Sequence, residues 1–476
     1  MDRRSLVLVA LVIGTLMSAI DTTIVILALP SITHDLHSSL ILTIWVIIIY
    51  LLIIAVMTTQ LGGLGDIYGR AKIFNTGFLV FILGSALCGA SPDIYYLLGF
   101  RAIQAVGASL MQANSSAIVA DTFEPEVRGR AFGFTTLGWN IGGVLGIVLG
   151  GIITTFIGWR YIFYINVPIG LVGFAIGLRV IKSQARRKVS IDIAGMLLLA
   201  AILSTVAYGA VYIAGHGFRA LNIGLIALGL VLIAPFVYQE KRAQRPVINP
   251  RAFRVRTLTF SLMATLFQAT GYLSVVFLLI MYLQGIKGYS PLDSSLILVP
   301  GYVIASLFAP RMGRLSDRVG ARMVATVGII LMAIGVLVYI TLRVSSPYYV
   351  VIIGSLVTGF GAAMFWPSNN SAVMSSSPPE LYGSSGGLMR TLSNIGTIIS
   401  YVLSISIASL TVSRTVAYEV FLGVIRLGSV SSQFLVGIRT AFIASVAILA
   451  LAGIFSFVRG HGHQVPQGTP EGTGKR

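Results

Sequence analysis

Apolar runs of about twenty residues recur along the whole chain, separated by short polar breaks. A transmembrane helix needs about 20 predominantly apolar residues, whereas a strand of an outer-membrane barrel alternates over about 10. The runs here are continuous, so they predict helices. The predicted spans are 6–30, 40–62, 73–91, 94–119, 131–157, 161–181, 193–215, 221–239, 257–284, 291–312, 323–342, 348–374, 384–410 and 435–458. This pattern predicts an all-α polytopic membrane protein with 14 transmembrane helices.

Three segments could be mistaken for other features. Arg3-Arg4 and the apolar run after them resemble a signal peptide, but the run continues to Pro30 without a clear cleavage site, which favours an uncleaved first helix. Within 411–434, the apolar stretch Val416–Val424 is too short to span a bilayer, so a hairpin or an interfacial element is expected. The polar residues 459–476 predict a disordered cytoplasmic tail.

Composition agrees with a membrane protein. Of 476 residues, 56% are hydrophobic and 10% are charged, with a mean hydropathy of +0.91. Soluble domains carry about 25% charged residues. The single cysteine, Cys88, cannot form an internal disulfide bond, which excludes a disulfide-based framework.

The net charge of +18 could suggest nucleic-acid binding, but the positions of the basic residues indicate otherwise. With the N-terminus placed inside, 24 of the 33 Lys and Arg residues lie in inner segments and 6 in outer segments, while Arg101, Arg390 and Arg439 lie within spans. This bias predicts that both termini are cytoplasmic. The expected partner is therefore the lipid bilayer, and no nucleic acid.

An internal repeat predicts the architecture. The segment Gly62–Lys72 after the second span recurs, shifted by 251 residues, as Gly313–Arg322 after the tenth span. Gly107-Ala108 in the fourth span recurs at a shift of 254 as Gly361-Ala362 in the twelfth span, and Pro125-Glu126 recurs as Pro379-Glu380. A shift of eight spans indicates two six-helix halves with two helices inserted between them, a plan typical of transporters with a site at the midplane. The predicted domains are 1–188 (N-terminal bundle), 189–256 (two-helix linker), 257–458 (C-terminal bundle) and 459–476 (tail).

Asp21 is the one carboxylate deep within a predicted span. A charge in the hydrocarbon region costs about 2.5–3.5 kcal/mol or more, so such a residue is a functional candidate. Arg101 in the fourth span lies at a similar depth, since both residues are roughly 10–14 Å below the outer surface at 1.5 Å per residue. A nearby arginine favours the carboxylate and burial favours the neutral acid, so the pair could act as a proton switch. A hydrogen bond from Asp21 to Thr or Asn, or an anchor from Arg101 to backbone carbonyls, would be the structural alternatives.

Further candidates line other helices. The fifth span is rich in glycine, which permits close helix packing. Its signature residues are Gly133, Gly142, Gly146, Gly150 and Gly151. Amide and aromatic residues could line a substrate cavity, although each alone is more often a core residue; they are Gln112, Trp139, Asn140, Gln268, Tyr272, Tyr302, Trp366, Asn369 and Asn394.

These motifs together resemble the major facilitator superfamily, in particular its fourteen-helix drug:proton antiporter family. The resemblance implies that Gly62, Gly69, Asp66 and Arg70 form the cytoplasmic gate, and that Asp317 and Arg318 match its weaker second copy. It also implies proton transfer at Arg101 and neighbouring Gln104. Asp21 fits the first-helix signature, and the glycines of the fifth span fit the antiporter signature, with Ile147 standing where a proline is expected.

The resemblance implies a proton-coupled secondary transporter of the plasma membrane that exports hydrophobic or cationic small molecules by alternating access, as a monomer. It requires no cofactor or metal beyond the proton gradient. An exporter or flippase of lipids or endogenous metabolites is the alternative on the same fold. A membrane-embedded transferase would need polar catalytic residues clustered at one membrane face, and a scaffold would not require Asp21 opposite Arg101; an enzyme is not expected.

Overall fold

The computed structural model describes residues 2–182, 190–216, 219–377, 382–409 and 429–460, and the described chain is helical. It contains 14 helices that are long and apolar enough to cross a membrane, which confirms the predicted number of spans. The helical elements are α1 (Arg3–Asp35), α2 (Leu40–Tyr68), α3 (Arg70–Gly89), α4 (Ile94–Thr122), α5 (Pro125–Phe156), α6 (Tyr161–Tyr164), α7 (Asn166–Val180), α8 (Ile193–His216), α9 (Ala220–Arg242), η1 (Pro250–Arg254), α10 (Arg256–Tyr272), α11 (Val275–Ile280), η2 (Met281–Ile286), α12 (Pro291–Val319), α13 (Ala321–Ile340), α14 (Tyr349–Ser376), α15 (Tyr382–Ser409) and α17 (Ser429–Val458).

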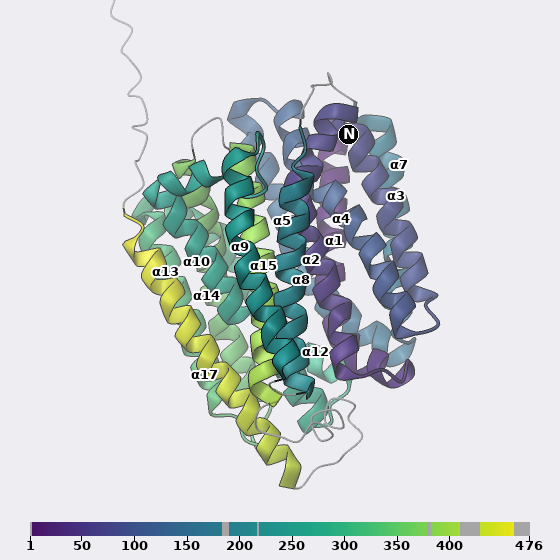
Figure 1. Cartoon of the computed structure of the whole chain (residues 1–476), viewed down its shortest axis with the longest axis vertical. Coiled ribbons are helices and arrows are strands. Elements are labelled where there is room, and N and C mark those ends of the chain that lie inside the picture. Colours follow the sequence, from purple (N-terminus) through teal and green to yellow (C-terminus); the bar gives the residue numbers. More distant parts are fainter. Residues whose placement is uncertain (1, 183–189, 217–218, 378–381, 410–428, 461–476) are drawn as a thin grey trace, which may run out of the picture.

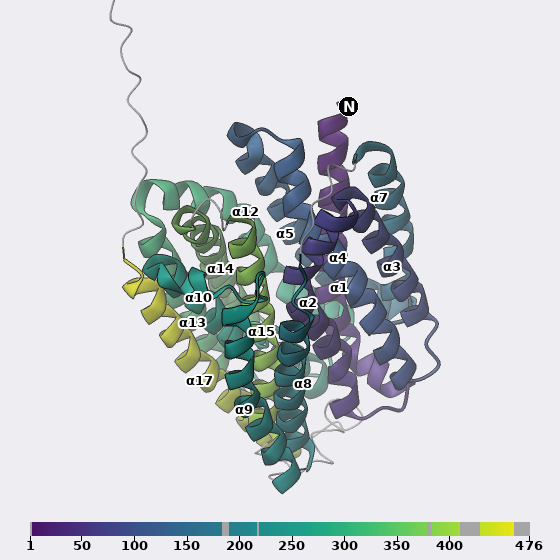
Figure 2. The ribbon, with the colours of Figure 1, turned by 45° about the horizontal axis from the view of Figure 1, so that its top comes forward.

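Helices pack within two groups. Helices α1 to α7 contact one another, as do α10 to α17, and the groups meet where α5 packs against α12 and α2 against α15. The two groups stand side by side in Figure 1. Helices α8 and α9 pair with each other, and α8 contacts both α2 and α15, so the hairpin covers one seam between the groups (Figures 1 and 2). The division into six, two and six helices as separate domains stays a prediction.

The internal repeat is visible in backbone geometry. Gly69, between α2 and α3, has φ 99°, and Gly320, between α12 and α13, also has φ 99°. Non-glycine residues rarely adopt this conformation, so both joints depend on glycine. In the first half a Cβ on Gly77 would lie 3.0 Å from the Gly107 carbonyl oxygen. The same crossing recurs in the second half, where a Cβ on Gly328 would lie 2.6 Å from the Gly361 carbonyl oxygen.

Two predicted spans are interrupted. The span predicted at 161–181 consists of α6 and α7, because Pro168 has no N–H to donate to the turn that would continue from α6. The span predicted at 257–284 breaks after Tyr272, where the N–H of Ser274 donates to Ser400 Oγ of α15 at 3.1 Å instead of continuing the helix. It ends in η2, a π-helix.

The last span also differs from its prediction. Helix α17 begins at Ser429, not at 435, so the end of the segment 411–434 is helical. The remainder of that segment to residue 428 lies outside the described residues, as do Pro379-Glu380 and the tail from 461. The predictions for those residues stay predictions. The prediction that the disordered tail begins at 459 is wrong for Arg459, which is buried and donates to Asn369 of α14.

Candidate functional site

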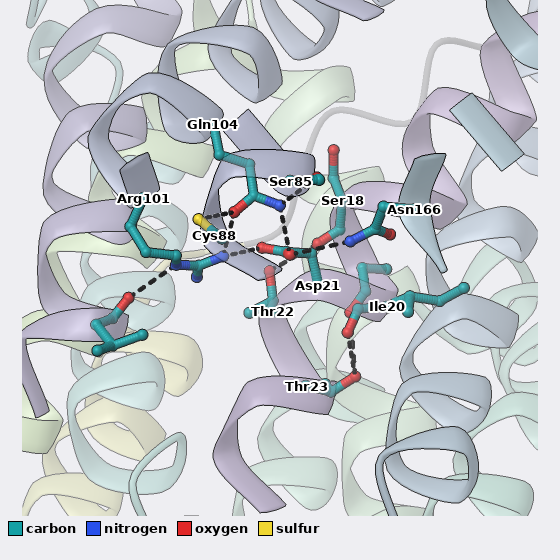
Figure 3. A network of polar contacts seen from close by, with 12 residues as sticks. Ser18, Ile20, Asp21, Thr22, Thr23, Ser85, Cys88, Arg101, Gln104 and Asn166 are labelled. Atoms are coloured by element: carbon teal, nitrogen blue, oxygen red, sulfur yellow. Dashed lines mark hydrogen bonds and ion pairs between the residues drawn. The ribbon is translucent and has the colours of Figure 1, made fainter. Parts of the chain in front are cut away.

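A buried polar network joins α1 to α4, α3 and α7 (Figure 3). Asp21 Oδ2 accepts a hydrogen bond from Arg101 Nη1 at 2.6 Å, and Asp21 Oδ1 accepts one from Gln104 Nε2 at 2.8 Å. Asn166 Nδ2 lies 3.3 Å from the same Oδ1, and Gln104 Nε2 also donates to Ser85 Oγ at 2.7 Å. Asp21 is 0% exposed and Arg101 is 1% exposed. The sequence prediction brought these two residues to the same depth, and the structure joins them directly.

Arg101 is held on every side. Its Nε donates to the Val46 carbonyl oxygen of α2 at 3.0 Å, and its Nη1 also donates to Gln104 Oε1 at 2.6 Å. The guanidinium carbon lies 4.2 Å from the ring centroid of Tyr50 and 5.6 Å from that of Phe163. Guanidinium groups are attracted to aromatic faces, most strongly where water is excluded. The arginine therefore keeps local partners whether or not Asp21 is charged.

This geometry stabilises a buried carboxylate. An uncompensated buried carboxylate costs several kcal/mol, and the ion pair with Arg101 offsets part of that cost. A proton on Asp21 would remove its charge but leave the network, because a neutral acid still accepts from Gln104. Arg101 stays charged throughout, since guanidinium groups do not deprotonate in proteins.

The glycines of α5 lie in a row against the backbone of α1. A Cβ on Gly142, Gly146 or Gly150 would lie 2.7, 2.8 or 3.1 Å from a carbonyl oxygen of α1. The row begins one turn earlier, at Gly138. Each glycine lies against one residue of α1, and both the glycines and these residues recur every four positions. The pairs are Gly138 with Val12, Gly142 with Leu16, Gly146 with Ile20 and Gly150 with Ile24. The helix that carries Asp21 is thus packed closely along a row of glycines.

Two other glycines of α5 face the second half. A Cβ on Gly143 would lie 4.0 Å from Tyr302 of α12, and one on Gly151 would lie 2.9 Å from the Pro291 carbonyl oxygen. A Cβ on Gly133 would meet nothing within 4 Å. Ile147 is buried in a helix that continues without interruption from Pro125 to Phe156.

The predicted gate residues form a charge cluster at the end of α2. Arg70 donates to Asp66 Oδ1 through Nε at 3.0 Å and through Nη2 at 2.8 Å, and its Nη1 lies 2.6 Å from Asp121 Oδ1 of α4. Arg245, which follows α9, lies 3.1 Å from Asp66 Oδ2. In the second copy, Asp317 and Arg318 are exposed, and no ion pair in the described chain includes either.

The hairpin is tied to α2 beside this cluster. Gln60 of α2 donates through Nε2 to the Arg245 carbonyl oxygen at 2.9 Å. Its Oε1 accepts from the N–H of Asp192, directly before α8, at 3.0 Å. One glutamine therefore contacts both ends of the inserted hairpin.

The candidate cavity residues are spread over several helices of both halves. Gln268 and Asn369 are fully buried within the second half, where Asn369 Nδ2 donates to Thr265 Oγ1 at 2.8 Å and Asn369 Oδ1 accepts from Arg459 at 3.0 Å. Tyr302 lies between the halves beside Gly143. Trp139 is 40% exposed. Gln112, Asn140, Tyr272, Trp366 and Asn394 are partly buried on their respective helices.

A cavity of about 510 Å³ lies at the predicted outer end of the bundle, opposite the charge cluster at the end of α2. It is bounded by the ends of α1 and α5, by α6, and by Gln284, Tyr289 and Pro291 of the second half. Two hydrogen bonds cross between the halves nearby. Gln284 Nε2 donates to the Leu27 carbonyl oxygen at 3.3 Å, and the N–H of Leu292 donates to Thr155 Oγ1 at 3.1 Å.

Several residues of these clusters carry no distinctive sequence signal. Asp121 and Arg245 lie at ordinary helix ends, where charged residues are common. Tyr50 and Ser85 belong to apolar runs and are indistinguishable there from core residues. Asn166 lies within an apolar span, and nothing in its spacing points toward Asp21. A buried amide within a span is the one signal that could have flagged it.

Comparison with known proteins identifies the family. The chain matches the Major Facilitator Superfamily over residues 11–401. It belongs to this superfamily. Relatives include riboflavin transporter RibZ of Clostridioides difficile (30% identical; 83% of this chain and 86% of the relative) and the tetracenomycin C resistance and export protein of Streptomyces glaucescens (30%; 84% and 76%). Multidrug resistance protein Stp of Mycobacterium tuberculosis is also 30% identical, over 86% and 77% of the two chains.

Solved structures share the fold. A bacterial homologue of the human lysosomal transporter Spinster aligns with a TM-score of 0.66 at 16% identity, covering 96% of this chain and 97% of that chain. A D-xylose-proton symporter aligns with a TM-score of 0.65 at 15% identity, covering 97% and 99%. The protein is a multi-pass transporter of the cell membrane that carries small molecules, and not an enzyme. Its relatives are consistent with the drug:proton antiporter family that the motifs predicted.

Proposed function

We propose that this superfamily member exports hydrophobic or cationic small molecules in exchange for protons by alternating access. The observation that carries this proposal is the fully buried pair of Asp21 and Arg101. A carboxylate kept in a spanning helix, with a permanent cation and an amide as partners, is suited to binding and releasing one proton. The proton gradient would be the energy source.

In this mechanism Asp21 carries the proton and Arg101 tunes it. Access from the outer side would hydrate the network and let a proton neutralise Asp21, which frees Arg101 Nη1 from its ion pair. Arg101 would still be held by Val46, Gln104 and the Tyr50 ring. Rocking of the two halves then changes the burial of Asp21, and release on the inner side restores the ion pair. Only the difference in proton affinity between the two states can drive the cycle.

The gate follows from the charge cluster at the end of α2. Asp66 and Arg70, supported by Asp121 and Arg245, would hold the turn at Gly69 in place. This would keep the cytoplasmic side of the transporter closed until the ion pairs break. The cluster is partly exposed, so its ion pairs are weak enough to break during a transport cycle.

Substrate class is supported by the relatives. Two of them are named for multidrug resistance and for tetracenomycin C resistance and export. Asp21 alone could accommodate a lipophilic monocation, and a neutral amphipathic molecule would need no further charge. The riboflavin transporter among the relatives favours a second candidate, transport of an endogenous metabolite with a fused aromatic ring.

The test is transport in proteoliposomes under an imposed pH gradient, with a lipophilic aromatic cation and riboflavin as alternative probes. We expect the unmodified protein to move one of them and release protons in exchange, and Asp21→Asn to abolish proton-driven movement while the protein stays folded. Asp293→Asn, at an exposed carboxylate in the first turn of α12, is the matched control and should transport normally. Unchanged gradient-driven transport by Asp21→Asn would overturn the coupling role.

A further inference from the structure

The inserted hairpin contains two carboxyl groups that play no part in the proposed transport cycle. Asp192 lies directly before α8 and is 8% exposed, and Glu240 lies in the last turn of α9 and is 3% exposed. Acidic side chains are almost never this deeply buried unless they are paired. Their burial therefore needs a partner.

The two carboxyl groups converge on one point. Glu240 Oε1 lies 2.8 Å from the position that a Cβ on Gly195 would occupy, and Asp192 Oδ2 lies closer still. Gly195 is the third residue of α8, and its lack of a side chain leaves the space that these two oxygens occupy. A larger residue here would drive them apart.

Three of the four carboxyl oxygens have donors. Asp192 Oδ1 accepts from the N–H of Gly195 at 2.9 Å and from Gln239 Nε2 at 2.8 Å. Glu240 Oε2 accepts from the N–H of Ile248 at 2.8 Å, and Oε1 accepts from the N–H of Val247 at 3.3 Å. Asp192 Oδ2 is buried and has no partner among the described residues.

The neighbouring cations of the described chain are engaged elsewhere. Arg245 pairs with Asp66 of α2, the guanidinium of Arg242 stacks on the Tyr238 ring, and Lys241 is exposed. No ion pair in the described part includes Asp192 or Glu240. Two adjacent buried carboxylates that pair with no cation of the described residues cannot both ionise at low cost, which favours a proton or a bound cation between them.

We propose that Asp192 and Glu240 form a proton-binding site that holds one proton between Asp192 Oδ2 and Glu240 Oε1. A shared proton gives the unpartnered Asp192 Oδ2 a hydrogen-bonding partner, and Glu240 keeps its two backbone N–H donors. Asp192 Oδ1 remains a carbonyl acceptor for the first turn of α8, the role that a neutral Asn fills equally well at a helix start.

A single residue of α2, Gln60, connects this site to the proposed gate. The N–H of Asp192 and the carbonyl oxygen of Arg245 share Gln60 of α2, and the Arg245 side chain reaches Asp66. A proton in the hairpin would therefore act on the segments that Gln60 and Arg245 connect to α2. The site is independent of Asp21 and does not require the proposed export function.

Infrared difference spectroscopy of the full-length protein in liposomes tests this site in an Asp21→Asn background, where the first-helix carboxyl group cannot contribute. We expect the carbonyl-stretch band of a protonated carboxyl group near neutral pH, and its loss in Asp192→Asn or Glu240→Gln. Glu124→Gln, which removes an exposed carboxylate paired with Arg4, should keep the band. Absence of the band in the Asp21→Asn protein, or its persistence when Asp192 and Glu240 are both neutralised, would overturn the proposal without bearing on export.

Thermal unfolding distinguishes a proton from a metal cation. Because the folded protein binds a proton that the unfolded chain releases, stability should fall as pH rises, and the Asp192→Asn variant should lose that slope, equivalent to one proton per molecule. Its stability should otherwise be kept, because the Asn amide can donate to Glu240. Stabilisation by added NaCl or MgCl2 that depends on Asp192, in place of the pH dependence, would overturn the assignment to a proton.

Discussion

At the scale of single residues, the network around Asp21 separates the group that can change charge from the groups that hold it. Arg101 has partners on α2 and α4 besides the carboxylate, so its position does not depend on Asp21. Gln104 donates to Asp21 and accepts from Arg101, and it therefore sets the distance between them.

Removal of the cation should be more damaging than removal of the pair. Arg101→Ala leaves a buried carboxylate with no cation and should lower the free energy of unfolding by about 3–5 kcal/mol. Adding Asp21→Asn to that variant should recover a large part of the loss, because no buried charge remains. Thermal unfolding of the four proteins of this double-mutant cycle in detergent measures the coupling. Equal loss in Arg101→Ala and in the double variant would contradict a direct ion pair.

Sequence alone could predict Asp21 and Arg101 because charge is so scarce within the spans that each stands out. It could also place both at one depth, because a helix rises by a constant length per residue. It could not predict Tyr50, Ser85 or Asn166 as their neighbours. Which face of a helix turns toward α1 depends on packing across residues distant in the chain, and these residue types are unremarkable in an apolar run.

At the scale of helices, α1 and α5 interlock through glycines spaced by four residues, which matches the ridge formed by every fourth residue of a helix. Carbonyl oxygens of α1 approach these glycines closely, with α1 side chains such as Thr23 beside them. Gly133 belongs to the same signature but faces open space, which provides a control on the same helix.

A side chain at this contact should separate the two helices. Gly146→Val would place methyl groups against the Ile20 carbonyl oxygen and Thr23, and should destabilise the protein by about 1–3 kcal/mol with loss of transport. Gly133→Val should be nearly neutral by the same thermal-unfolding and proteoliposome measurements. Similar behaviour of the two variants would show that the close approach has no energetic consequence.

The hairpin offers a second prediction at this scale. Arg245→Ala removes the contact between the segment after α9 and Asp66, so the rate of gradient-driven transport should change several-fold, with reduced dependence on salt. Stability should change by only about 0–1 kcal/mol, because the pair is partly exposed. Arg242→Ala, an exposed arginine that stacks on Tyr238, is the control measured beside it. An unchanged transport rate in Arg245→Ala would show that the hairpin is not coupled to the gate.

The number of spanning helices was predictable from hydropathy, since length and apolar content decide whether a segment can cross a bilayer. The breaks within spans were not. At Ser274 the backbone leaves the helix because Ser400 of a distant helix accepts its N–H, and no local signal announces that partner. Pro168 is the exception, because proline terminates a helical turn through its own chemistry.

At the scale of the whole molecule, the two halves repeat in backbone but not in charge. The joints at Gly69 and Gly320 share one conformation, yet Arg101 corresponds by the shift of 254 residues to Ser355, and Gln104 to Thr358. The duplicated frame therefore holds a charged network in one half and hydroxyl groups in the other. The repeat was predictable from two matched motifs, whereas the contact of α5 with α12 required the folded chain.

Alternating access requires the outer contacts between the halves to separate. In a Cys88→Ser background, cysteines at Thr155 and Leu292 should form a link under oxidant or with a short bifunctional reagent, since Thr155 Oγ1 lies 3.1 Å from the Leu292 backbone nitrogen. The linked protein should lose transport and regain it on reduction. Each single-cysteine variant, treated in the same way, should keep its activity. Full transport by the linked protein would contradict opening at this end.

The fixed charge of Arg101 has a consequence for energetics. With Asp21 ionised the pair is neutral, and with Asp21 protonated the first half carries one positive charge inside the bilayer. The transmembrane voltage acts on that charge with about 2.3 kcal/mol per 100 mV for a full crossing. Under the proposed coupling, the protonation of Asp21 would decide whether this site carries a net charge on which the voltage can act. A membrane potential without any pH difference should therefore favour either the inward-open or the outward-open state of the protonated transporter.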